Sequence, residues 1–296
     1  MFKYPDSTIP ITKSDFVRYL DCPLYAWLWK NKPELKEGHK NSRIADQGEE
    51  VEKLAHRLFT GGEEVKGNYQ EAEKHTKELM SSGAKIIYQA TALTDHYLAR
   101  ADILKRDRDG KRWHIYEVKS STKKKPEHMP DLCFQLNAFR QAGFEIASVN
   151  LVLVNSDYIY REATGLEVDK FFKIEDLTEE IFSKIDEYKI EMKESYKILT
   201  GDSEPKVLSL KKNFKYPLPE KFEEYYWKDV PDFSVYDISN IRKNKLELLR
   251  GRNILKMQDI PDDFELSDSQ NLQVQLTKKE TNFIDVENIK NELVAL

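Results

Sequence analysis

Cysteine is scarce in this chain: its 296 residues include only Cys22 and Cys133. Two thiols are too few for a disulfide framework, so we expect a protein of a reducing compartment such as the cytoplasm. The sequence also lacks a long apolar run and the hydrophobic stretch of a secretory signal peptide. We therefore expect no membrane partner.

A strong excess of one charge is absent as well. Lys and Arg total 47, Asp and Glu total 52, and the formal net charge is −5. A basic chain would suggest a nucleic-acid binder, but an enzyme that cuts nucleic acid needs only a local basic patch. The charge balance therefore leaves a nucleic-acid substrate open.

Hydrophobic residues make up 40% of the chain, as in an ordinary folded enzyme. Their helical spacing predicts helices at 12–32, 44–60, 70–82, 129–143 and 176–200. Runs rich in β-branched and aromatic residues predict strands at 85–93, 97–104, 113–120 and 148–154. This order predicts an α/β fold with a mixed central sheet flanked by helices.

The character of the chain changes after Gly201. Residues 202–231 hold four prolines and little periodicity, and 232–296 contain short helical patterns with many charges. We place a domain boundary here, with a first domain at 1–201 and a helical or irregular C-terminal extension at 202–296. The extension is expected to pack on the core or to bind a protein partner.

A predicted hairpin brings two carboxylates and a lysine together. Asp102 lies in its first strand, Glu117 and Lys119 lie in its second, and the Asp-Gly pair at 109–110 forms the turn. Alternate side chains of a strand share a face, so Glu117 and Lys119 point the same way and Asp102 can lie beside them. Such carboxylates suit a divalent metal that activates water against a phosphodiester.

An exposed surface ion pair is the alternative reading of Glu117 and Lys119, because Glu-X-Lys is common on solvated strands. Two observations weigh against it. Tyr116 and Val118 give the strand an apolar opposite face, and Asp102 lies in an otherwise apolar run. A lone carboxylate is costly to bury in such a run without a partner.

The segments around these residues resemble the core of the PD-(D/E)XK nuclease superfamily. The resemblance rests on residues 99–104, 116–121 and 131–139, and it is strongest to the RecB-type branch, which includes CRISPR-associated exonucleases. Residues 11–28 are similar to an uncharacterised bacterial group in which such a nuclease is usually fused to an RNase H-like domain. Covering roughly residues 10–265, the resemblance implies a restriction-endonuclease-like core and a nuclease of DNA repair or defence.

The resemblance also implies roles for the hairpin residues. Asp102 and Glu117 would bind Mg²⁺ or Mn²⁺ together with the backbone carbonyl of Val118. Lys119 would orient the attacking water or stabilise the charge that grows on the phosphate. DNA is favoured over RNA as the substrate, while the polarity of cleavage and the choice between endonuclease and exonuclease stay open.

Further candidates follow the second strand. RecB-type nucleases carry Gln-X-X-X-Tyr on the next helix, where its polar ends orient the lysine and the phosphate. This chain has Gln135, but Phe139 replaces the tyrosine. Lys123, Lys124 and Lys125 lie at the expected mouth of the site and are candidates for contacting the nucleic-acid backbone, although a solvated loop explains them equally well.

The helix predicted at 44–60 supplies a further metal ligand by the same resemblance. Related nucleases have a glycine followed four residues later by His or Glu. Gly48 and Glu52 match this spacing, His56 lies one turn further on, and Glu49 is a weaker candidate. Charged residues beside an apolar stripe are ordinarily solvated, which is the competing explanation.

An iron–sulfur cluster is expected to be absent. Many RecB-type relatives bind a four-iron cluster through one N-terminal and three C-terminal cysteines. Cys22 takes the N-terminal place, but Tyr216 and Tyr226 stand where later cysteines are expected, and no cysteine follows Cys133. We expect Cys22 to be a small buried hydrophobic residue.

The sequence thus predicts a metal-dependent nuclease and leaves one alternative. Loss of the cluster and of the tyrosine would also fit a catalytically inactive nuclease-fold subunit that binds nucleic acid or assists assembly. The retained Asp102, Glu117 and Lys119 favour the enzyme, because an idle site has no reason to keep two repelling carboxylates.

Overall fold

The computed structural model describes residues 10–36, 43–206, 218–281, 284 and 286. The chain forms two compact units. Unit 1 contains the described residues up to 33 and from 43 to 206, and unit 2 contains residues 34–36 and those from 218 onward. Residues 202–206 are thus grouped with unit 1, and the functional domain boundary after residue 201 stays a prediction.

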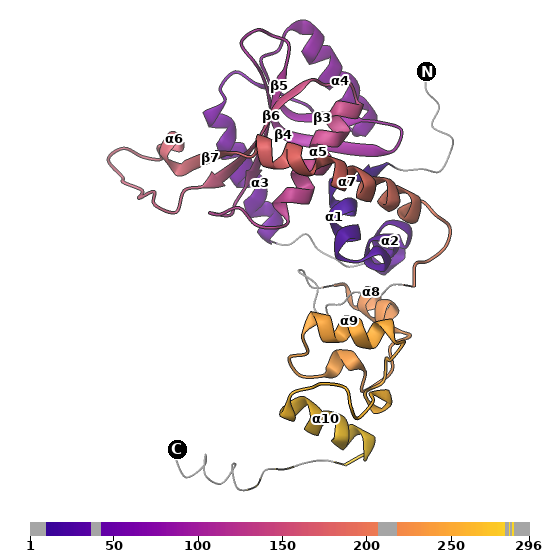
Figure 1. The fold of residues 1–296 in the computed structure, drawn as a ribbon. Coiled ribbons are helices and arrows are strands. Elements are labelled where there is room, and N and C mark those ends of the chain that lie inside the picture. The colour runs from indigo at the N-terminus through magenta and orange to yellow at the C-terminus, as the bar shows by residue number, and fades with distance from the viewer. Residues whose placement is uncertain (1–9, 37–42, 207–217, 282–283, 285, 287–296) are drawn as a thin grey trace. The chain divides into compact units, whose positions relative to one another are not determined.

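A seven-stranded mixed sheet forms the centre of unit 1, in the order β2-β3-β4-β5-β6-β7, with β1 paired to β4 (Figure 1). The strands are β1 (Ile11–Thr12), β2 (Glu63–Glu64), β3 (Ile86–Leu93), β4 (Tyr97–Arg106), β5 (Trp113–Lys119), β6 (Ile146–Val154) and β7 (Phe172–Asp176). β3, β4 and β5 are antiparallel neighbours, as are β6 and β7, whereas β5 and β6 are parallel. This sheet confirms the predicted α/β fold.

Helices flank the sheet. They are α1 (Lys13–Asp21), α2 (Pro23–Asn31), α3 (Arg43–Ala55), α4 (Tyr69–Ser82), α5 (His128–Gln141), α6 (Val168–Phe171) and α7 (Thr178–Leu199), with a 3-10 turn η2 (His56–Leu58). α5 is the crossover between the parallel strands β5 and β6, and it packs beside α7 and against β3, β4 and β6.

The N-terminal region differs in one respect from its prediction. A single helix was expected over 12–32, but Cys22 adopts an extended backbone and separates α1 from α2. Pro23 is the physical reason, because a proline ring cannot donate the amide that would continue α1, and it suits the first turn of α2. Thr12 and Asp15 form the expected capping box at the start of α1.

Both faces of β5 are covered. Residues 131–139 of α5 are all buried, and they cover the face that carries Glu117. On the opposite face Val118 belongs to an apolar cluster with the end of α3 and with β6 and β7, made of Ala55, Phe59, Tyr88, Ile103, Val118, Val152, Val168 and Phe172. Strand alternation therefore places Glu117 and Lys119 on the face covered by α5, together with the buried Trp113 and Ile115, and Val118 on the other.

Unit 2 is helical, as predicted for the C-terminal region. It contains α8 (Glu220–Trp227), α9 (Lys243–Gly251), α10 (Asp268–Lys278) and the 3-10 turns η3 (Val235–Asp237) and η4 (Met257–Asp259), and the 3-10 turn η1 (Pro33–Lys36) belongs to it except for Pro33. Its core is formed by Val235, Tyr236, Ile238, Leu246, Leu249, Met257, Ile260, Phe264 and Val274.

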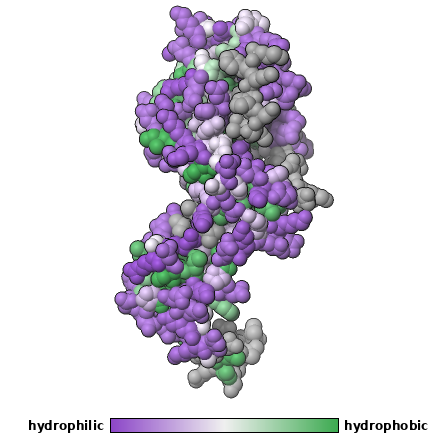
Figure 2. Space-filling view, turned by 90° about the vertical axis from the view of Figure 1, so that its right-hand side faces the viewer, coloured by the Kyte–Doolittle hydropathy of each residue, from purple (hydrophilic) through white to green (hydrophobic). Residues whose placement is uncertain are grey.

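The surface is dominated by polar side chains. The face drawn in Figure 2 is mostly hydrophilic, with hydrophobic residues in small separate patches, as expected for a chain in which 33% of residues are charged. Among the described helices, none has the length and apolar content needed to cross a bilayer.

Candidate active site

The β4–β5 hairpin brings the three predicted hairpin residues together. Ile103 pairs with Tyr116 at the end of the regular ladder, so Asp102 and Glu117 are the next residues on the two strands. Beyond this pair the strands separate, and Asp102 Oδ2 accepts a hydrogen bond from the Val118 amide at 2.7 Å. The Asp102 side chain thus takes the place of a backbone acceptor beside Glu117.

Glu117 is the buried centre of the site, with 1% of its surface exposed. Its Oε1 accepts from Lys119 Nζ at 2.6 Å, and its Oε2 accepts from Gln135 Nε2 at 2.6 Å. A buried carboxylate needs such partners, because burial of an unpaired charge is costly. The sequence-predicted pair is therefore no exposed surface ion pair.

Gln135 is fully buried on α5 and faces the sheet. Besides Glu117, its Nε2 donates to Asp131 Oδ1 at 3.1 Å, whereas its Oε1 is buried without a hydrogen-bond partner among the described residues. Phe139, one turn further along, packs edge-on against Phe144 in the core. The replacement of the tyrosine hydroxyl therefore leaves an apolar contact at that position.

Three carboxylates repel one another on one side of the cluster. Burial, together with repulsion from Glu117, raises the pKa of Asp102 well above its usual value. Burial also raises the pKa of Glu52, to which repulsion from Glu117 contributes. A cation placed among the three carboxylates would reverse both effects.

Gln89 connects Glu52 of α3 to the hairpin. Its Nε2 donates to Glu52 Oε1 and lies 3.5 Å from Asp102 Oδ1. The backbone of Gln89 has a φ of 55°, a left-handed conformation that is uncommon for a residue with a side chain and often marks a functional site. Sequence reasoning missed this residue, because nothing in a strand-like run indicates a single left-handed position.

His56 lies next to Glu52, with Nε2 3.8 Å from Glu52 Oε1. The ring stacks on Tyr88 at 3.8 Å between centroids, and Nε2 is buried without a hydrogen-bond partner among the described residues. Burial lowers the pKa of His56, which favours the neutral form that can bind a metal. Glu49, in contrast, is exposed and pairs with Lys53 at 2.5 Å.

Two charged residues of the cluster were not given roles from the sequence. Asp131 of α5 contacts Lys119 Nζ at 2.6 Å, and Lys13 at the start of α1 contacts Glu117 Oε1 at 2.7 Å. Asp131 lies one helical turn before Gln135, a spacing that could have indicated it. Lys13 is 104 residues from Glu117, and no local pattern reports such a contact.

Opposite charges fix the protonation states in this cluster. Burial lowers the pKa of Lys119, but Asp131 and Glu117 outweigh it and raise that pKa well above its usual value. Burial likewise raises the pKa of Asp131, yet Lys119 and Lys13 hold it below its usual value. Lys119 is therefore an ammonium cation, and Asp131 is its ionised partner.

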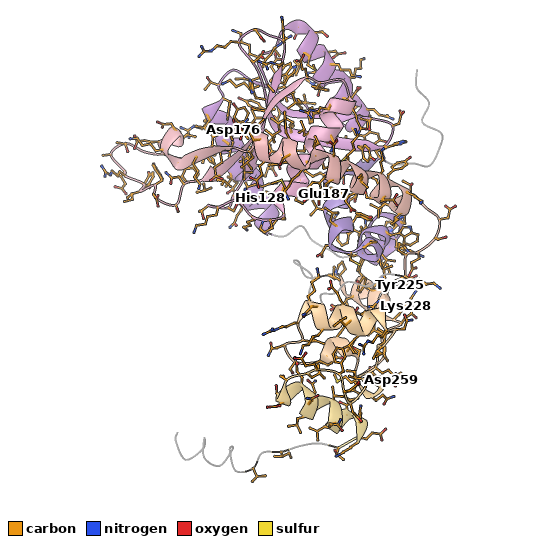
Figure 3. All side chains as sticks on the ribbon, in the orientation of Figure 1. His128, Asp176, Glu187, Tyr225, Lys228 and Asp259 are labelled. Carbon is orange, nitrogen blue, oxygen red and sulfur yellow. The ribbon has the colours of Figure 1, made fainter. Side chains whose placement is uncertain are left out.

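Lys123, Lys124 and Lys125 lie in an exposed loop that follows β5 directly. Lys124 pairs with Glu180 at 2.6 Å, and the Lys125 amide donates to Nδ1 of His128, which is labelled in Figure 3 at the start of α5. In the part of the chain that the structure describes, Lys123 and Lys125 have no ion pair. Their ammonium groups are thus available to solvent.

The residues that bear on an iron–sulfur cluster are in apolar surroundings where they are described. Cys22 is buried, and its Sγ accepts from the Tyr25 amide at 3.5 Å. Burial raises the pKa of the Cys133 thiol to about 12. Tyr226 is buried in α8, and Tyr216 lies outside the described residues. The expected absence of the cluster stays a prediction.

The oxygen atoms of this cluster are of the chemical type that divalent cations such as Mg²⁺ bind. Glu52, Asp102 and Glu117 supply carboxylate oxygens, the ligands that Mg²⁺ and Mn²⁺ prefer. As the described side chains stand, no group of three or more His, Cys, Asp or Glu residues is arranged to hold a metal. In this arrangement Glu117 Oε1 accepts from two lysines, and Gln89 donates to Glu52.

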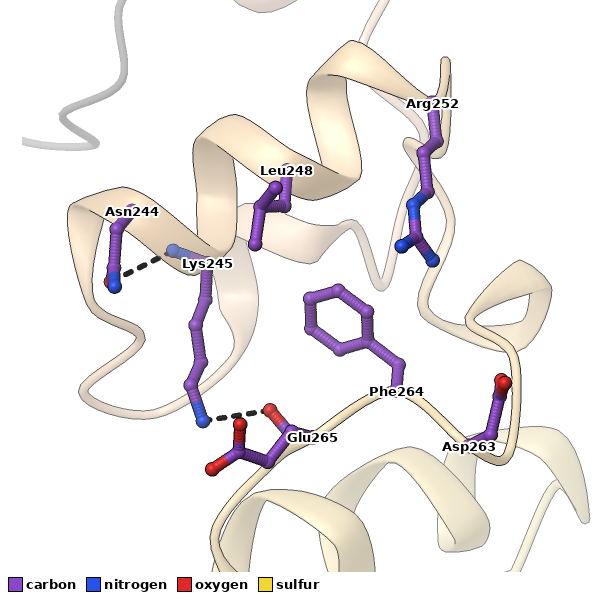
Figure 4. A pocket seen from close by; sticks show the side chains of 7 residues that line it. All are labelled: Asn244, Lys245, Leu248, Arg252, Asp263, Phe264 and Glu265. Carbon is purple, nitrogen blue, oxygen red and sulfur yellow. Dashed lines mark hydrogen bonds between the residues drawn. The ribbon is translucent and has the colours of Figure 1, made fainter.

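Two surface pockets lie outside this cluster. One, of about 260 Å³, lies in unit 2 between α9 and the segment after η4, where Lys245 Nζ donates to the Glu265 carbonyl beside Leu248 and Phe264 (Figure 4). The other is lined by residues 147–148 and 176–180 at the start of α7. Neither is lined by the hairpin carboxylates Asp102 and Glu117.

No protein-family model and no curated protein sequence matches the chain. Among solved structures it is similar to the crystal structure of SSO0001, with a TM-score of 0.39, 14% identity, and coverage of 67% of this chain and 80% of the other. It is also similar to an alkaline exonuclease, LHK-Exo, from Laribacter hongkongensis, alone and in complex with dAMP. For both structures of this exonuclease, the TM-score is 0.35 and the identity is 12%. The match covers 64% of this chain and 91% of the exonuclease chain. Likenesses of this extent do not assign a function, which has to come from the geometry of the site.

Proposed function

We propose that the chain is a divalent-metal-dependent nuclease that hydrolyses phosphodiester bonds in DNA, a member of the RecB-type branch of the PD-(D/E)XK nucleases. One observation carries the proposal. Glu117 is buried beside Asp102 on the adjacent strand, and an ammonium group, Lys119, contacts it at 2.6 Å. Two adjacent carboxylates can hold a divalent ion that activates water, and a fixed cation beside them can stabilise the charge that develops on the phosphate.

The residues proposed to hold Mg²⁺ or Mn²⁺ are Asp102, Glu117 and the carbonyl of Val118, completed by Glu52 or His56. When bound there, the ion supplies a Lewis acid and an activated water. Glu52 is the stronger candidate of the last two, because Gln89 links its carboxylate to Asp102.

Lys119 is proposed to stabilise the charge that develops on the phosphate. Because its pKa is raised, Lys119 stays protonated and cannot act as a general base. Asp131 fixes the ammonium group at 2.6 Å, and Gln135 fixes Glu117 at the same distance. A donor that is already in place when charge develops needs no reorganisation, which is the source of its catalytic effect.

Exposed cations supply the proposed contacts to the nucleic-acid backbone. Lys123 and Lys125 follow the catalytic strand by a few residues and are exposed. Lys124 is partly neutralised by Glu180 and would contribute less. The helical unit 2 is proposed to bind a protein partner, and repair or defence is the proposed setting.

A catalytically inactive binding or assembly subunit is the second candidate. One observation favours it: Glu117 Oε1 accepts hydrogen bonds from both Lys13 and Lys119, so this oxygen is already occupied without a metal. In such a protein the cluster would stabilise the fold and would have no need of a metal.

Two measurements distinguish the nuclease from the inactive subunit: the melting temperature with and without metal, and digestion of DNA. We expect MnCl₂ to raise the melting temperature of the wild type, because a ligand that binds only the folded state stabilises it. Glu52→Gln should reduce this rise, whereas Glu49→Gln, an exposed residue on the same helix, should leave it unchanged. Plasmid and single-stranded DNA should then be digested only with metal present. A protein that neither responds to metal nor digests DNA is the inactive subunit.

A further inference from the structure

Two lysines from different elements meet on the same pair of carboxylates. Lys119 Nζ lies 2.6 Å from Glu117 Oε1 and 2.6 Å from Asp131 Oδ2. Lys13 Nζ lies 2.7 Å from Glu117 Oε1 and 3.2 Å from Asp131 Oδ1. The four charges alternate around a closed ring, in which Lys13 and Lys119 have equivalent positions.

The backbone of Lys13 is fixed by the fold. The residue begins α1 directly after the capping residue Thr12, and the strand before it pairs with β4, where Ile11 lies opposite Tyr97. β4 is also the strand that carries Asp102. Lys13 is thus placed by the same element as Asp102, and its position is a feature of the fold.

Both lysine side chains are held by the two carboxylates and are partly exposed. The side chain of Lys13 is 25% exposed and that of Lys119 is 24% exposed, whereas Glu117 and Asp131 are almost completely buried. An anion that approaches the cluster from solvent therefore meets the partly exposed lysine side chains before the buried carboxylates. Because both nitrogens contact one oxygen, they are close enough together to donate to two oxygens of a single phosphate.

A phosphate group suits the two lysines. In the ring, two ammonium groups neutralise two carboxylates. A divalent cation shared by Glu117, Asp102 and Glu52 would draw on the negative charge of Glu117, so this carboxylate would compensate the two lysines less. A phosphodiester carries a negative charge and two non-bridging oxygens that can accept hydrogen bonds from both ammonium groups.

We propose that Lys13 is a second phosphate-binding lysine of the active site, which acts with Lys119 on the non-bridging oxygens of the scissile phosphate. The inference rests on the proposed nuclease function and extends it to a lysine pair fixed by Asp131. The competing role for Lys13 is a structural one, in which it merely ties α1 to β5.

A matched pair of variants separates the two roles. Lys13→Gln removes the proposed phosphate contact. Lys30→Gln removes another lysine of the same region, whose Nζ contacts the Pro10 carbonyl at 3.2 Å and Asp15 at 3.7 Å and does not contact the ring. Melting temperature and circular dichroism of both variants report the structural contribution.

Single-turnover cleavage with Mg²⁺ is the first readout. Lys13→Gln should slow cleavage by roughly 100-fold, the scale for loss of one preorganised electrostatic donor, while Lys30→Gln cleaves at the wild-type rate. Lys13→Arg keeps the positive charge and can still pair with Glu117 and Asp131. It therefore serves as a variant that should fold even if Lys13→Gln does not. It should keep the melting temperature and still cleave at least about 10-fold more slowly, because the planar guanidinium does not reproduce the position of the ammonium.

Binding to a single-stranded oligonucleotide is the second readout, measured with Mg²⁺ in the Asp102→Asn background to prevent cleavage. Lys13→Gln should lower the slope of log affinity against log salt by about 0.7, as for one phosphate contact. Wild-type cleavage rates and an unchanged slope in both Lys13 variants would overturn the inference and leave a structural tether. An inactive wild type would instead overturn the proposed function, and the binding slope would still test Lys13.

Discussion

Lys119 Nζ lies 2.6 Å from Asp131 Oδ2, so the predicted catalytic lysine is fixed by the helix that follows its own strand. This contact ties α5 to the site, and Gln135, one turn further along the same buried helix face, contacts Glu117 as well. The lysine is held by two carboxylates, Glu117 and Asp131, and it remains charged. An arrangement of this kind provides a fixed positive charge next to the proposed metal ligands.

Asp131 and Asp102 should affect stability in opposite directions. Because the folded-state pKa of Asp131 is depressed, its contribution is present above the ordinary carboxyl pKa of 3.8 and is lost as the pH falls through the folded value. Asp131→Asn should therefore destabilise the metal-free protein at neutral pH by about 3 kcal/mol, the scale for breaking a buried pair.

The pKa of Asp102 is raised instead, so its ionisation destabilises the fold as the pH rises from 3.8 through the folded value. Asp102→Asn should raise the metal-free melting temperature at neutral pH by about 3 °C, the scale of a 1 kcal/mol gain. The gain should disappear near pH 3, where the carboxyl is protonated in both states. Thermal melts of both variants across pH 3 to about 8 test the pair, and shifts of the same sign at neutral pH would contradict this description of the cluster.

Lys119→Ala should lower the turnover rate by roughly 100-fold with little change in nucleic-acid affinity. Its ammonium group is one contact among many to the nucleic-acid backbone, but it lies next to Glu117, beside the proposed position of the scissile phosphate, where charge develops. Single-turnover rates measured beside binding curves give the comparison. A loss of affinity with an unchanged rate would make Lys119 a backbone contact and would favour the inactive subunit.

The loop after β5 should show the reverse behaviour. Replacing Lys123 and Lys125 together by Gln should weaken binding to duplex DNA and lower its salt slope by about 2, while the rate at saturation is nearly kept. The same change at two other exposed lysines, Lys66 and Lys74, is the control. If the control pair alters the slope as much as the loop pair, the loop has no special role.

The purified protein should be colourless and free of iron. A four-iron cluster needs four thiolates, and the chain has only Cys22 and Cys133, both buried. Iron analysis and an absorption spectrum test this directly. Stoichiometric iron together with a broad band near about 400 nm would show that the cluster prediction is wrong.

The sequence predicted the part of the site that local pattern controls. Asp102 and Glu117 are fifteen residues apart on one hairpin, and strand alternation together with a turn at Gly110 is enough to place them side by side. The helix that carries Gln135 follows the hairpin directly along the chain. Its apolar residues on both sides of Gln135 indicated that this part of the helix is buried.

The rest depends on tertiary packing. Lys13 reaches Glu117 because β1 pairs with β4, a pairing of two residues that carries no recognisable pattern. Gln89 contacts Glu52 and has itself a left-handed backbone conformation within a strand, which strand periodicity does not indicate. The predicted helix over 12–32 was wrong at Cys22 because helical spacing on both sides concealed the break that Pro23 imposes.

Cleavage by Asp102→Ala is the most direct test of the central claim. Wild type and variant would be compared in single-turnover digestion of linear duplex and single-stranded DNA with Mg²⁺ and with EDTA, after circular dichroism has shown that both are folded. The proposed site predicts metal-dependent cleavage by the wild type and a loss of roughly 100-fold or more in the variant, because Asp102 is a metal ligand. A folded Asp102→Ala protein that cuts DNA as fast as the wild type under Mg²⁺ would contradict it.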